Sequence, residues 1–553
     1  MRTPVQRAIL ILSLFVLFPL FAQIDSVQIQ EIDSLFIRWN RPNHPGGAIG
    51  VVKDGKTIFS RAYGLASLEY LVPNSTGTIF NTGSVSKQFT AMGIVRLEEQ
   101  GMLSFDDEIH KYIPELPDFE HPITIRQMLH HTSGLRSLHA LFALAGWRDD
   151  DARTNEDLNR IILKQQDLNF EPGAEYLYCN TGYMLMVNII EKVTGVSFPG
   201  WMQEQIFIPL GMVHTYVEDQ YDRVVPDNAT SYYGREEFDR AVEYWGYVGS
   251  GNMHSTTADL LKWLSNFRSP QKGWASAFRT LQTLDPLNDG TPNEYAFGVV
   301  VDEHLGKKRI RHGGAIGGFR AFIAAYPEAG LDIAVLTNFS AGNPGGNADR
   351  IAEIVLGKPD GDKSESGPPA AIQLKQEDLS VLEGAYWNNR EKYLRKIYLK
   401  SDTLRYWRSE NSESALVPVD KDTFKMLGAG DAVRVTFEPL EVGQRMKFME
   451  NGMVTAIFDM VEDTENSEGQ LPEYTGAYYS PEIENTYTVT LQAGALQLYH
   501  PRHGDIPLKR LFPDVYSGEW PVGTVEFQRN PAGRVTGILI SNGRVRNAWF
   551  EKQ

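Results

Sequence analysis

The sequence predicts an α/β (α+β) domain, with one antiparallel sheet flanked by helices, followed by two small all-β domains of barrel-like form. Three observations lead to this fold class. A helical pattern and a hairpin pattern open the first part of the chain, and a hairpin and a helix close it near residue 357. Beyond residue 371 short alternating strands replace the helices. A chain of 553 residues is also too long for a single hydrophobic core, so several domains are expected.

The first 22 residues have the pattern of a signal peptide. Two arginines precede an apolar run, Ala8 to Phe21, which is too short to span a bilayer comfortably. Ala22 suits cleavage, although Leu20 is larger than the residue usually found two places before the cut. We therefore expect an exported protein, periplasmic or secreted, with no stable membrane anchor after cleavage. A retained anchor is the alternative.

Residues 23–357 form the predicted α/β domain. Apolar residues follow helical spacing from Ile24 to Trp39, and two β-rich runs on either side of Asp54-Gly55 predict a hairpin. A second hairpin is expected to turn between Pro327 and Gly330, and a helical pattern follows from Asn347. Because the hairpins lie just inside the two terminal helices, we expect distant parts of the chain to pair in one antiparallel sheet.

Two β units follow a linker. The segment 358–374 is largely Gly, Pro, Ser and acidic residues, as exposed linkers are. The sequence LEGAYWN, from Leu382, recurs approximately as YTGAYYS from Tyr474, and NGMVTAIFDM resembles AGRVTGILIS further along. We therefore expect two related barrel-like domains, at 375–465 and 471–553. Neither contains a convincing catalytic cluster.

Charge and cysteine content exclude several classes of function. A formal charge of -17, without a cluster of Lys and Arg to offset it, disfavours binding to nucleic acid. Cys179 is the only cysteine, so neither an intramolecular disulfide nor a cysteine-based metal site is possible. The twelve histidines show no His-Glu-x-x-His pattern, and we expect no metal site.

A Ser-x-x-Lys pattern opens an amphipathic segment in NTGSVSKQFTAMG. Ser84 and Lys87 lie on one face of the predicted helix, so the lysine amine can approach the serine oxygen. A serine hydroxyl is a weak nucleophile without a base, and a lysine acts as a base only if burial or nearby positive charge lowers its pKa. The helix N-terminus also offers N–H groups to an anion. A second match, Ser269 to Lys272, contains Pro270 and is expected to be a loop.

The segment Tyr178-Cys179-Asn180 supplies a hydroxyl and an amide. In an extended or turn segment, residues two apart point the same way, so both groups can face one cleft. A half-buried tyrosine with a satisfied hydroxyl is the structural alternative. Ser250-Gly251-Asn252 and Tyr386-Trp387-Asn388 have related patterns and compete with this segment.

The segment His312-Gly313-Gly314 introduces the second hairpin. Glycines at this point let a substrate backbone approach the strand closely, and the N–H of Ala315 can help to bind an oxyanion. A simple turn or bulge is the alternative for the glycines.

In this order the three motifs resemble those of the penicillin-binding protein and β-lactamase superfamily of serine hydrolases, particularly its class C-like branch of esterases and D-aminopeptidases. The resemblance covers about residues 30 to 357 and includes TIRQMLHHTSGL from Thr124, whose His131 and Ser133 we expect to be structural. It implies a β-lactamase/transpeptidase-like catalytic domain. The two β units are similar to the barrel domains, lipocalin-like in form, that D-aminopeptidase-like members carry.

The resemblance also implies a reaction. Ser84 would be the acylated nucleophile, Lys87 its base and Tyr178 the proton donor to the leaving group, although the identity of the base is disputed within the superfamily. Water then attacks the acyl-enzyme, so no cofactor is required.

The same resemblance assigns the residues that hold the substrate. The N–H groups of Ser84 and Ala315 would form the oxyanion hole, where loss of one donor typically costs about 100-fold or more in rate. Asn180 would hold the amide of the acyl side chain. His312, together with Gly313-Gly314, would orient the substrate in the cleft.

One departure from the family pattern bears on the substrate. Many penicillin-recognising members have Lys at the position of His312, and that cation suits a terminal carboxylate, whereas histidine is mostly neutral at pH 7. This favours D-amino-acid-containing peptides, amides or esters. Arg320 is the candidate to replace the missing charge, with a solvated strand position as its alternative. We also expect a loop of one barrel to reach the cleft and restrict substrate size.

The leading hypothesis is a serine acyl hydrolase acting on a small molecule or short peptide, such as a peptidoglycan-derived compound. Among enzymes, the alternative is a carboxylesterase, a β-lactamase or a D,D-carboxypeptidase that uses the same residues. From another class, the alternative is an exported receptor that is acylated at Ser84 and turns over slowly, with its β units binding a partner.

Overall fold

One antiparallel sheet of six strands organises the first domain. In a computed structural model that describes residues 26–358, 372–429, 433–450, 452–462 and 468–553, the order is β12-β13-β14-β15-β1-β2. The N-terminal hairpin therefore lies beside strands from the end of the domain. The strands are β12 (Val300–His304), β13 (Lys307–Ile316), β14 (Phe319–Tyr326), β15 (Leu331–Thr337), β1 (Gly47–Lys53) and β2 (Lys56–Tyr63).

Both predicted hairpins are confirmed. The β1–β2 turn contains Asp54 and Gly55, both with positive φ, as a tight two-residue turn between right-handed strands requires. The β14–β15 turn contains the short 3-10 helix η5 (Pro327–Ala329) and ends at Gly330. The predicted pairing of distant segments is also confirmed, since β1 pairs with β15 along its whole length.

Helices cover both faces of this sheet. Because successive side chains of a strand point to opposite faces, Val51 and Ile333 pack with α1 and α10, whereas Ala48 and Leu336 belong to the core of the helical region. Helix α8 packs against β1 and β15 on that second face. The α-helices are α1 (Ser26–Phe36), α2 (Lys87–Glu99), α3 (Ile125–Leu129), α4 (Leu138–Leu144), α5 (Asn155–Ile162), α6 (Asn180–Thr194), α7 (Phe198–Met202), α8 (Thr257–Ser265), α9 (Ala275–Thr280) and α10 (Pro344–Leu356).

Short strands support the loops around the helical region. They form small sheets that join segments distant in sequence. In one of them β11 lies between β5 and β7, and β5 comes directly before the segment that carries Ser84. These strands are β3 (Leu65–Ser67) with β4 (Val72–Pro73), β8 (Tyr232–Gly234) with β9 (Phe238–Arg240), β6 (Arg153–Thr154) with β10 (Trp245–Gly246), and β5 (Phe80–Asn81) and β7 (Tyr216–Val217) on either side of β11 (Met253–Ser255).

The terminal helices agree with the predicted patterns. The first is α1, which continues as the 3-10 turn η1 (Ile37–Trp39), and the last is α10, which begins at Pro344. The predicted signal peptide and most of the predicted linker, residues 359–371, lie outside the described residues. Among the residues that are described, no helix is both long and apolar enough to cross a membrane.

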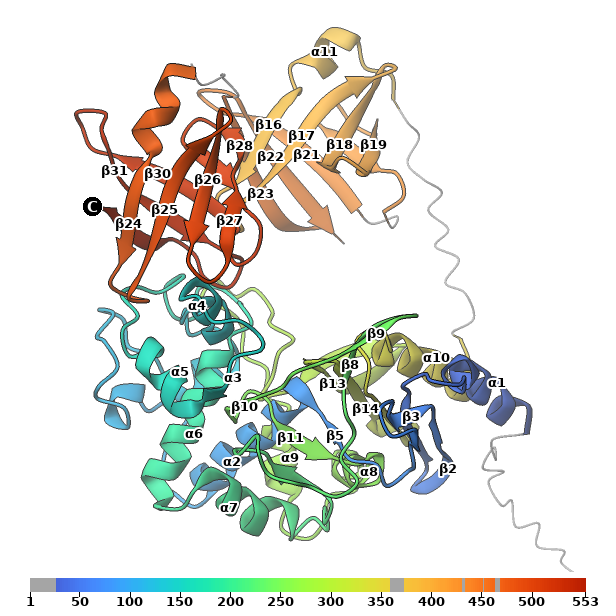
Figure 1. Cartoon of the computed structure of the whole chain (residues 1–553). Coiled ribbons are helices and arrows are strands. Elements are labelled where there is room, and N and C mark those ends of the chain that lie inside the picture. Colours follow the sequence, from blue (N-terminus) through green and yellow to red (C-terminus); the bar gives the residue numbers. More distant parts are fainter. Residues whose placement is uncertain (1–25, 359–371, 430–432, 451, 463–467) are drawn as a thin grey trace, which may run out of the picture.

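Two β barrels follow, as predicted (Figure 1). The first, preceded by α11 (Gln376–Ser380), is closed. Its strands are β16 (Gly384–Asn388), β17 (Tyr393–Lys400), β18 (Thr403–Ser409), β19 (Ser412–Pro418), β20 (Thr423–Met426), β21 (Val433–Pro439), β22 (Gln444–Glu450) and β23 (Met453–Val461).

The second barrel is a sheet of nine strands in the order β27-β26-β25-β24-β32-β31-β30-β29-β28. It is preceded by the 3-10 segment η6 (Glu468–Tyr474). Its strands are β24 (Gly476–Ser480), β25 (Asn485–Gln492), β26 (Ala495–His500), β27 (Gly504–Pro507), β28 (Lys509–Phe512), β29 (Val515–Ser517), β30 (Thr524–Arg529), β31 (Val535–Ser541) and β32 (Ala548–Lys552).

The repeated sequence at the start of each barrel makes the same contact twice. The buried Tyr386 hydroxyl donates to the carbonyl of Leu382 (2.9 Å), and the buried Tyr478 hydroxyl donates to that of Tyr474 (2.6 Å). The two copies of the second predicted repeat take different positions in their barrels. The first copy lies in β23, which pairs with the first strand of its barrel, β16. The second copy lies in β31, which pairs with β32, and it is β32 that pairs with the first strand of that barrel, β24.

The second barrel docks on the α/β domain at α4, and the first barrel packs against the second (Figure 1). The Tyr487 hydroxyl donates to the carbonyl of Leu144 at the end of α4 (3.0 Å), and apolar residues of both domains form one continuous core. At the same interface Arg136 forms an ion pair with Glu482, and the two side chains are only 1% and 2% exposed. Arg136 also donates to the carbonyl of Arg546 (3.0 Å).

We predict that Glu482→Gln weakens this interface strongly, because it leaves the Arg136 charge buried without a counterion. The expected loss is about 3–5 kcal/mol in the free energy of unfolding. Urea denaturation followed by tryptophan fluorescence measures it. Glu484→Gln is the matched control. Glu484 pairs with Lys164 across the same interface (2.5 Å), but its side chain is 49% exposed, so little change is expected. Equal effects of the two substitutions would contradict the prediction.

Candidate active site

Ser84 and Lys87 meet where a 3-10 turn passes into an α-helix. Ser84 lies in η2 (Gly83–Ser86), and Lys87 is the first residue of α2. Side chains three residues apart are eclipsed in a 3-10 turn, so this local conformation stacks one over the other. The Lys87 Nζ lies 3.2 Å from the Ser84 Oγ. Ser84 itself is partly exposed and lines a cavity of about 810 Å³.

Lys87 is fully buried and forms no ion pair with any carboxylate of the described residues. Its Nζ donates to the carbonyl of Ser250 (2.6 Å) and lies 4.8 Å from the centre of the Tyr178 ring. Burial lowers the pKa of Lys87 well below its usual value, and the positive charge of Arg544 lowers it further. This shift favours the neutral amine, whose lone pair can accept the hydroxyl proton of Ser84.

Tyr178 and Asn180 line the same cavity as Ser84. The Tyr178 hydroxyl is buried and makes no hydrogen bond within the described chain. Burial raises its pKa, opposed by the Ser84 hydroxyl and the charge of Arg544, so the phenol stays protonated. Asn180 begins α6, and its position two residues after Tyr178 brings both side chains to one cavity.

Strand β13 forms the opposite wall through His312, Gly313, Gly314 and Ala315. The strand and η2 approach so closely that neither can carry a larger residue at the contact. A Cβ on Gly314 would lie 1.9 Å from the carbonyl oxygen of Thr82, and one on Gly83, whose φ is +52°, would lie 2.7 Å from the Ala315 nitrogen.

This contact differs from the expectation for Gly314. The space left by its missing side chain is occupied by Thr82, not by a substrate backbone. At Gly313 a Cβ would meet only ordinary contacts, the nearest at 3.7 Å from Phe322. The close approach brings the main chain at Ser84 beside that at Ala315, which is the arrangement that two oxyanion-binding N–H groups need.

His312 is neutral and both its ring nitrogens are engaged. Nδ1 donates to the carbonyl of Gly313 (2.6 Å), so Nε2 must accept a hydrogen bond from the Tyr295 hydroxyl (2.9 Å). Burial, together with the nearby Lys87, lowers the pKa of His312 to about 3. The histidine thus lines the cavity without supplying the cation that a lysine would supply there.

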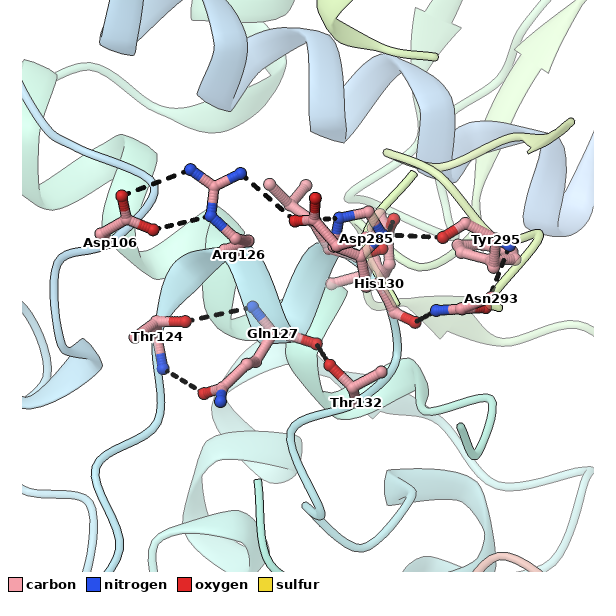
Figure 2. Close-up of polar contacts among 11 residues, drawn as sticks. Asp106, Thr124, Arg126, Gln127, His130, Thr132, Asp285, Asn293 and Tyr295 are labelled. Carbon is pink, nitrogen blue, oxygen red and sulfur yellow. Dashed lines mark hydrogen bonds and ion pairs between the residues drawn. The ribbon is translucent and has the colours of Figure 1, made fainter. Parts of the chain in front are cut away.

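A polar network behind the cavity holds Tyr295 in place (Figure 2). His130 Nδ1 donates to the Tyr295 carbonyl (2.7 Å), and Nε2 lies 3.0 Å from the carboxylate of Asp285. Arg126 contacts the same carboxylate (3.4 Å). At the start of α3 a capping box joins Thr124 and Gln127, whose main-chain nitrogens each bond the other's side chain.

The neighbouring His131 and Ser133 have structural contacts. His131 Nδ1 accepts from the Cys179 N–H (3.1 Å), and its ring stacks on Tyr178 with centroids 4.2 Å apart. The Ser133 hydroxyl accepts from the N–H of Leu135 (3.4 Å).

The sequence segments that compete with the Ser84 and Tyr178 motifs lie elsewhere in the structure or have another role in the site. Ser269-Pro270-Gln271-Lys272 is an exposed loop after α8, and Tyr386-Trp387-Asn388 belongs to β16 of the first barrel. Ser250 and Gly251 line the cavity together with Tyr178 and Asn180, so this segment adds to the Tyr178 motif rather than replacing it. Asn252 donates to the carbonyls of its own loop, while the Ser250 carbonyl receives Lys87.

Two residues of the site, Tyr295 and Arg544, belong to none of the sequence motifs. Ser250 belongs to a competing motif, but its contact with Lys87 is made by a main-chain oxygen, whose role no residue type reveals. Arg544 lies on the loop between β31 and β32, so a loop of the second barrel does reach the cavity. Across the described residues, no group of three or more His, Cys, Asp or Glu side chains is arranged to hold a metal ion.

A partly exposed serine beside a buried lysine, on an α/β domain with one antiparallel sheet, defines a serine hydrolase. The chain belongs to the Beta-lactamase family, whose family model matches residues 34–358, more than half of the chain. It is thus a β-lactamase-related serine hydrolase.

Two curated relatives are similar over this domain. Penicillin-binding protein 4* of Bacillus subtilis is 29% identical over 332 residues, covering 56% of this chain and 71% of that protein. A D-aminopeptidase of Cereibacter sphaeroides is 32% identical over 302 residues, covering 54% of this chain and 57% of that protein. The chain therefore spans less than two thirds of the length of the D-aminopeptidase.

Solved structures share the fold. The octameric penicillin-binding protein homologue from Pyrococcus abyssi superposes with a TM-score of 0.54 at 24% identity, over 78% of this chain and 99% of that one. The D-amino acid amidase from Ochrobactrum anthropi SV3 gives 0.51 at 22% identity, over 60% of this chain and 99% of that one. At these identities the comparison concerns the fold alone.

We predict that Gly314→Ala destabilises the protein, because the added methyl group would force Thr82 and the Ser84 turn away from β13. A loss of about 1–3 kcal/mol is expected, as for other overpacked sites. Gly313→Ala is the matched control on the same strand and should fold with unchanged stability. Thermal unfolding of the two variants measures the difference, and equal stability would contradict the close contact.

Proposed function

We propose that the protein is a serine acyl hydrolase that works through a Ser84 acyl-enzyme on D-amino-acid-containing peptides, amides or esters. One observation carries this proposal. The Lys87 amine is buried, has no acidic partner in the part of the chain that the structure describes, and lies 3.2 Å from the oxygen of a serine that opens into a cavity. A structural lysine would instead be paired or exposed, since an isolated buried ammonium is costly.

In the proposed reaction Ser84 Oγ attacks the substrate carbonyl carbon while its proton passes to the Lys87 amine. The carbonyl oxygen becomes an oxyanion, which the N–H groups of Ser84 and Ala315 stabilise. As the intermediate collapses, the bond to the leaving group breaks and the Tyr178 phenol supplies a proton to it. The proton held by Lys87 restores the phenol, and water then releases the acyl group by the same steps.

Three observations support the substrate class. D-Aminopeptidases of 31–32% identity are among the relatives, and the match includes only part of their length. Asn180 places an amide in the cavity, where it can bond the amide of an acyl group. On β13 the neutral His312 offers no cation of the kind that suits the carboxylate of penicillins.

We predict that Ser84→Ala abolishes hydrolysis of D-alanyl p-nitroanilide, with a loss of about 1,000-fold or more in kcat/KM. Ser269→Ala, in the exposed second Ser-x-x-Lys match, should retain full activity. Intact-mass spectrometry during turnover should show little adduct on the wild type. A lasting adduct with D-aminoacyl compounds, esters or a penicillin would favour a receptor, and full activity of Ser84→Ala would refute the proposal. Faster hydrolysis of the L-anilide would refute the D-substrate class.

The protonation of Lys87 gives a second prediction. Because the pKa of Lys87 in the folded protein is lowered, the amine is neutral above that pKa, and kcat/KM should fall as the pH decreases through it. Lys87→Arg, whose guanidinium cannot lose its proton, should be inactive at every pH. Lys272→Arg is the control and should keep the wild-type profile. Activity of Lys87→Arg would exclude Lys87 as the base.

A further inference from the structure

We propose that Arg544, on the β31–β32 loop of the second barrel, binds a carboxylate carried by the substrate. The proposal rests on the proposed function of Ser84, because it names a feature of the substrate that the same cavity receives. It extends that function to a substrate with a negative charge.

The loop that carries Arg544 is fastened to the catalytic domain through its main chain. The Arg544 carbonyl accepts from the Ser137 N–H (3.1 Å) and from the Asn169 side-chain amide (3.1 Å). Asn542, at the start of the loop, donates to the carbonyl of Ala140 (3.3 Å). The loop is thus held in place by contacts that do not use the guanidinium of Arg544.

Two arginines of this loop have opposite surroundings. Arg546 is buried and its guanidinium pairs with Glu175 (2.8 Å) and Glu391 (2.9 Å). The Arg544 side chain is exposed, and within the described residues its guanidinium has no ion pair or hydrogen bond. It lies 5.0 Å from the centre of the Tyr178 ring and lines the cavity of Ser84. Arg546 therefore holds the interface, whereas the charge of Arg544 is directed at the cavity.

The cavity contains no acidic group to neutralise this charge. Its lining among the described residues includes no Asp or Glu, and its other arginines are Arg235 and Arg320. Arg320 donates to the carbonyls of Gly317 (2.9 Å) and Phe319 (2.7 Å), so it is partly satisfied by its own hairpin. Of the three arginines, Arg544 is the one that lies over the Tyr178 ring and lowers the pKa of Lys87.

A guanidinium is suited to a carboxylate, because its planar fork can form two charge-assisted hydrogen bonds with the two oxygens. The charge that His312 does not supply from β13 is thereby supplied from another domain. The positive charge of Arg544 also acts on two groups of the proposed reaction. It lowers the pKa of Lys87 and opposes the rise in the pKa of Tyr178.

The carboxylate can belong to the acyl group or to the leaving group, and two substrate pairs distinguish these sources. N-succinyl-D-alanine p-nitroanilide and its N-acetyl analogue differ by a carboxylate on the acyl side. N-acetyl-D-alanyl-D-alanine and its C-terminal amide differ by one on the leaving side. Wild-type protein should prefer the carboxylate member of one pair by about 10- to 100-fold in kcat/KM.

Arg544→Gln should remove this preference while keeping the loop docked, because both hydrogen bonds of residue 544 with the α/β domain use its main-chain oxygen. Arg544→Lys should restore part of it. Arg534→Gln, an exposed arginine on the same barrel, is the matched control and should keep the preference. No preference in either pair, or one that survives Arg544→Gln, would overturn the proposal.

Binding measured without turnover separates this proposal from the proposed function. Isothermal titration of the four compounds into Ser84→Ala should show the same preference in Kd, and Ser84→Ala with Arg544→Gln should lose it. If wild type hydrolyses neither these four compounds nor D-alanyl p-nitroanilide, the proposed function fails, while the binding preference still decides the role of Arg544. Equal Kd values within both pairs would overturn that role.

The pH profile gives a readout that a merely structural arginine would not change. The titratable or charged groups around Lys87 are Tyr178, Tyr183, Cys179, the histidines 131, 139 and 312, and Arg544. Burial keeps the histidines neutral, so Arg544 is the permanent cation of the group. With a neutral substrate, Arg544→Gln should move the acidic limb of kcat/KM to higher pH. An unmoved limb would count against the placement of this charge.

Discussion

An uncharged lysine amine enclosed beside a serine is the constraint on which the rest of this structure depends. A lysine in water is protonated, and only desolvation or nearby positive charge makes it a base at neutral pH. The fold provides both conditions. The aromatic ring of Tyr178 and the Ser250 carbonyl surround the amine, carboxylates of the described residues do not pair with it, and Arg544 adds a positive charge. Each of these groups comes from a different part of the chain.

The close packing of η2 on β13 is the second requirement. The 3-10 turn places Ser84 over Lys87, and it can lie against the strand only because Gly83 and Gly314 have no side chains. The strand is in turn supported from behind, where His312 is held by Tyr295 and Tyr295 by His130. The position of the oxyanion-binding main chain therefore depends on a chain of contacts that extends to the capping box of α3.

The second barrel is part of the catalytic unit. Its core is continuous with that of the α/β domain, and the buried pair of Arg136 and Glu482 lies at the interface. Arg136 belongs to the segment before α4, whose Ser137 N–H also bonds the carbonyl of Arg544. Docking of the barrel and placement of a cation at the cavity are thus two results of one interface. The first barrel contacts the second through Trp387 and Phe512.

By itself, the sequence determined the features that arise from local spacing. The hairpin at Asp54-Gly55, the terminal helices, the two barrels and the Ser84–Lys87 pair all follow from patterns within a few residues, where backbone geometry relates spacing to position. Their order along the chain also identified the family. Tertiary structure alone decided that Gly314 faces Thr82, that Tyr295 holds His312, and that Arg544 lies over the Tyr178 ring while Arg320 bonds to carbonyls of its own hairpin. These three features depend on contacts between segments far apart in sequence, and a pattern within a few residues does not specify which distant segments will pack together.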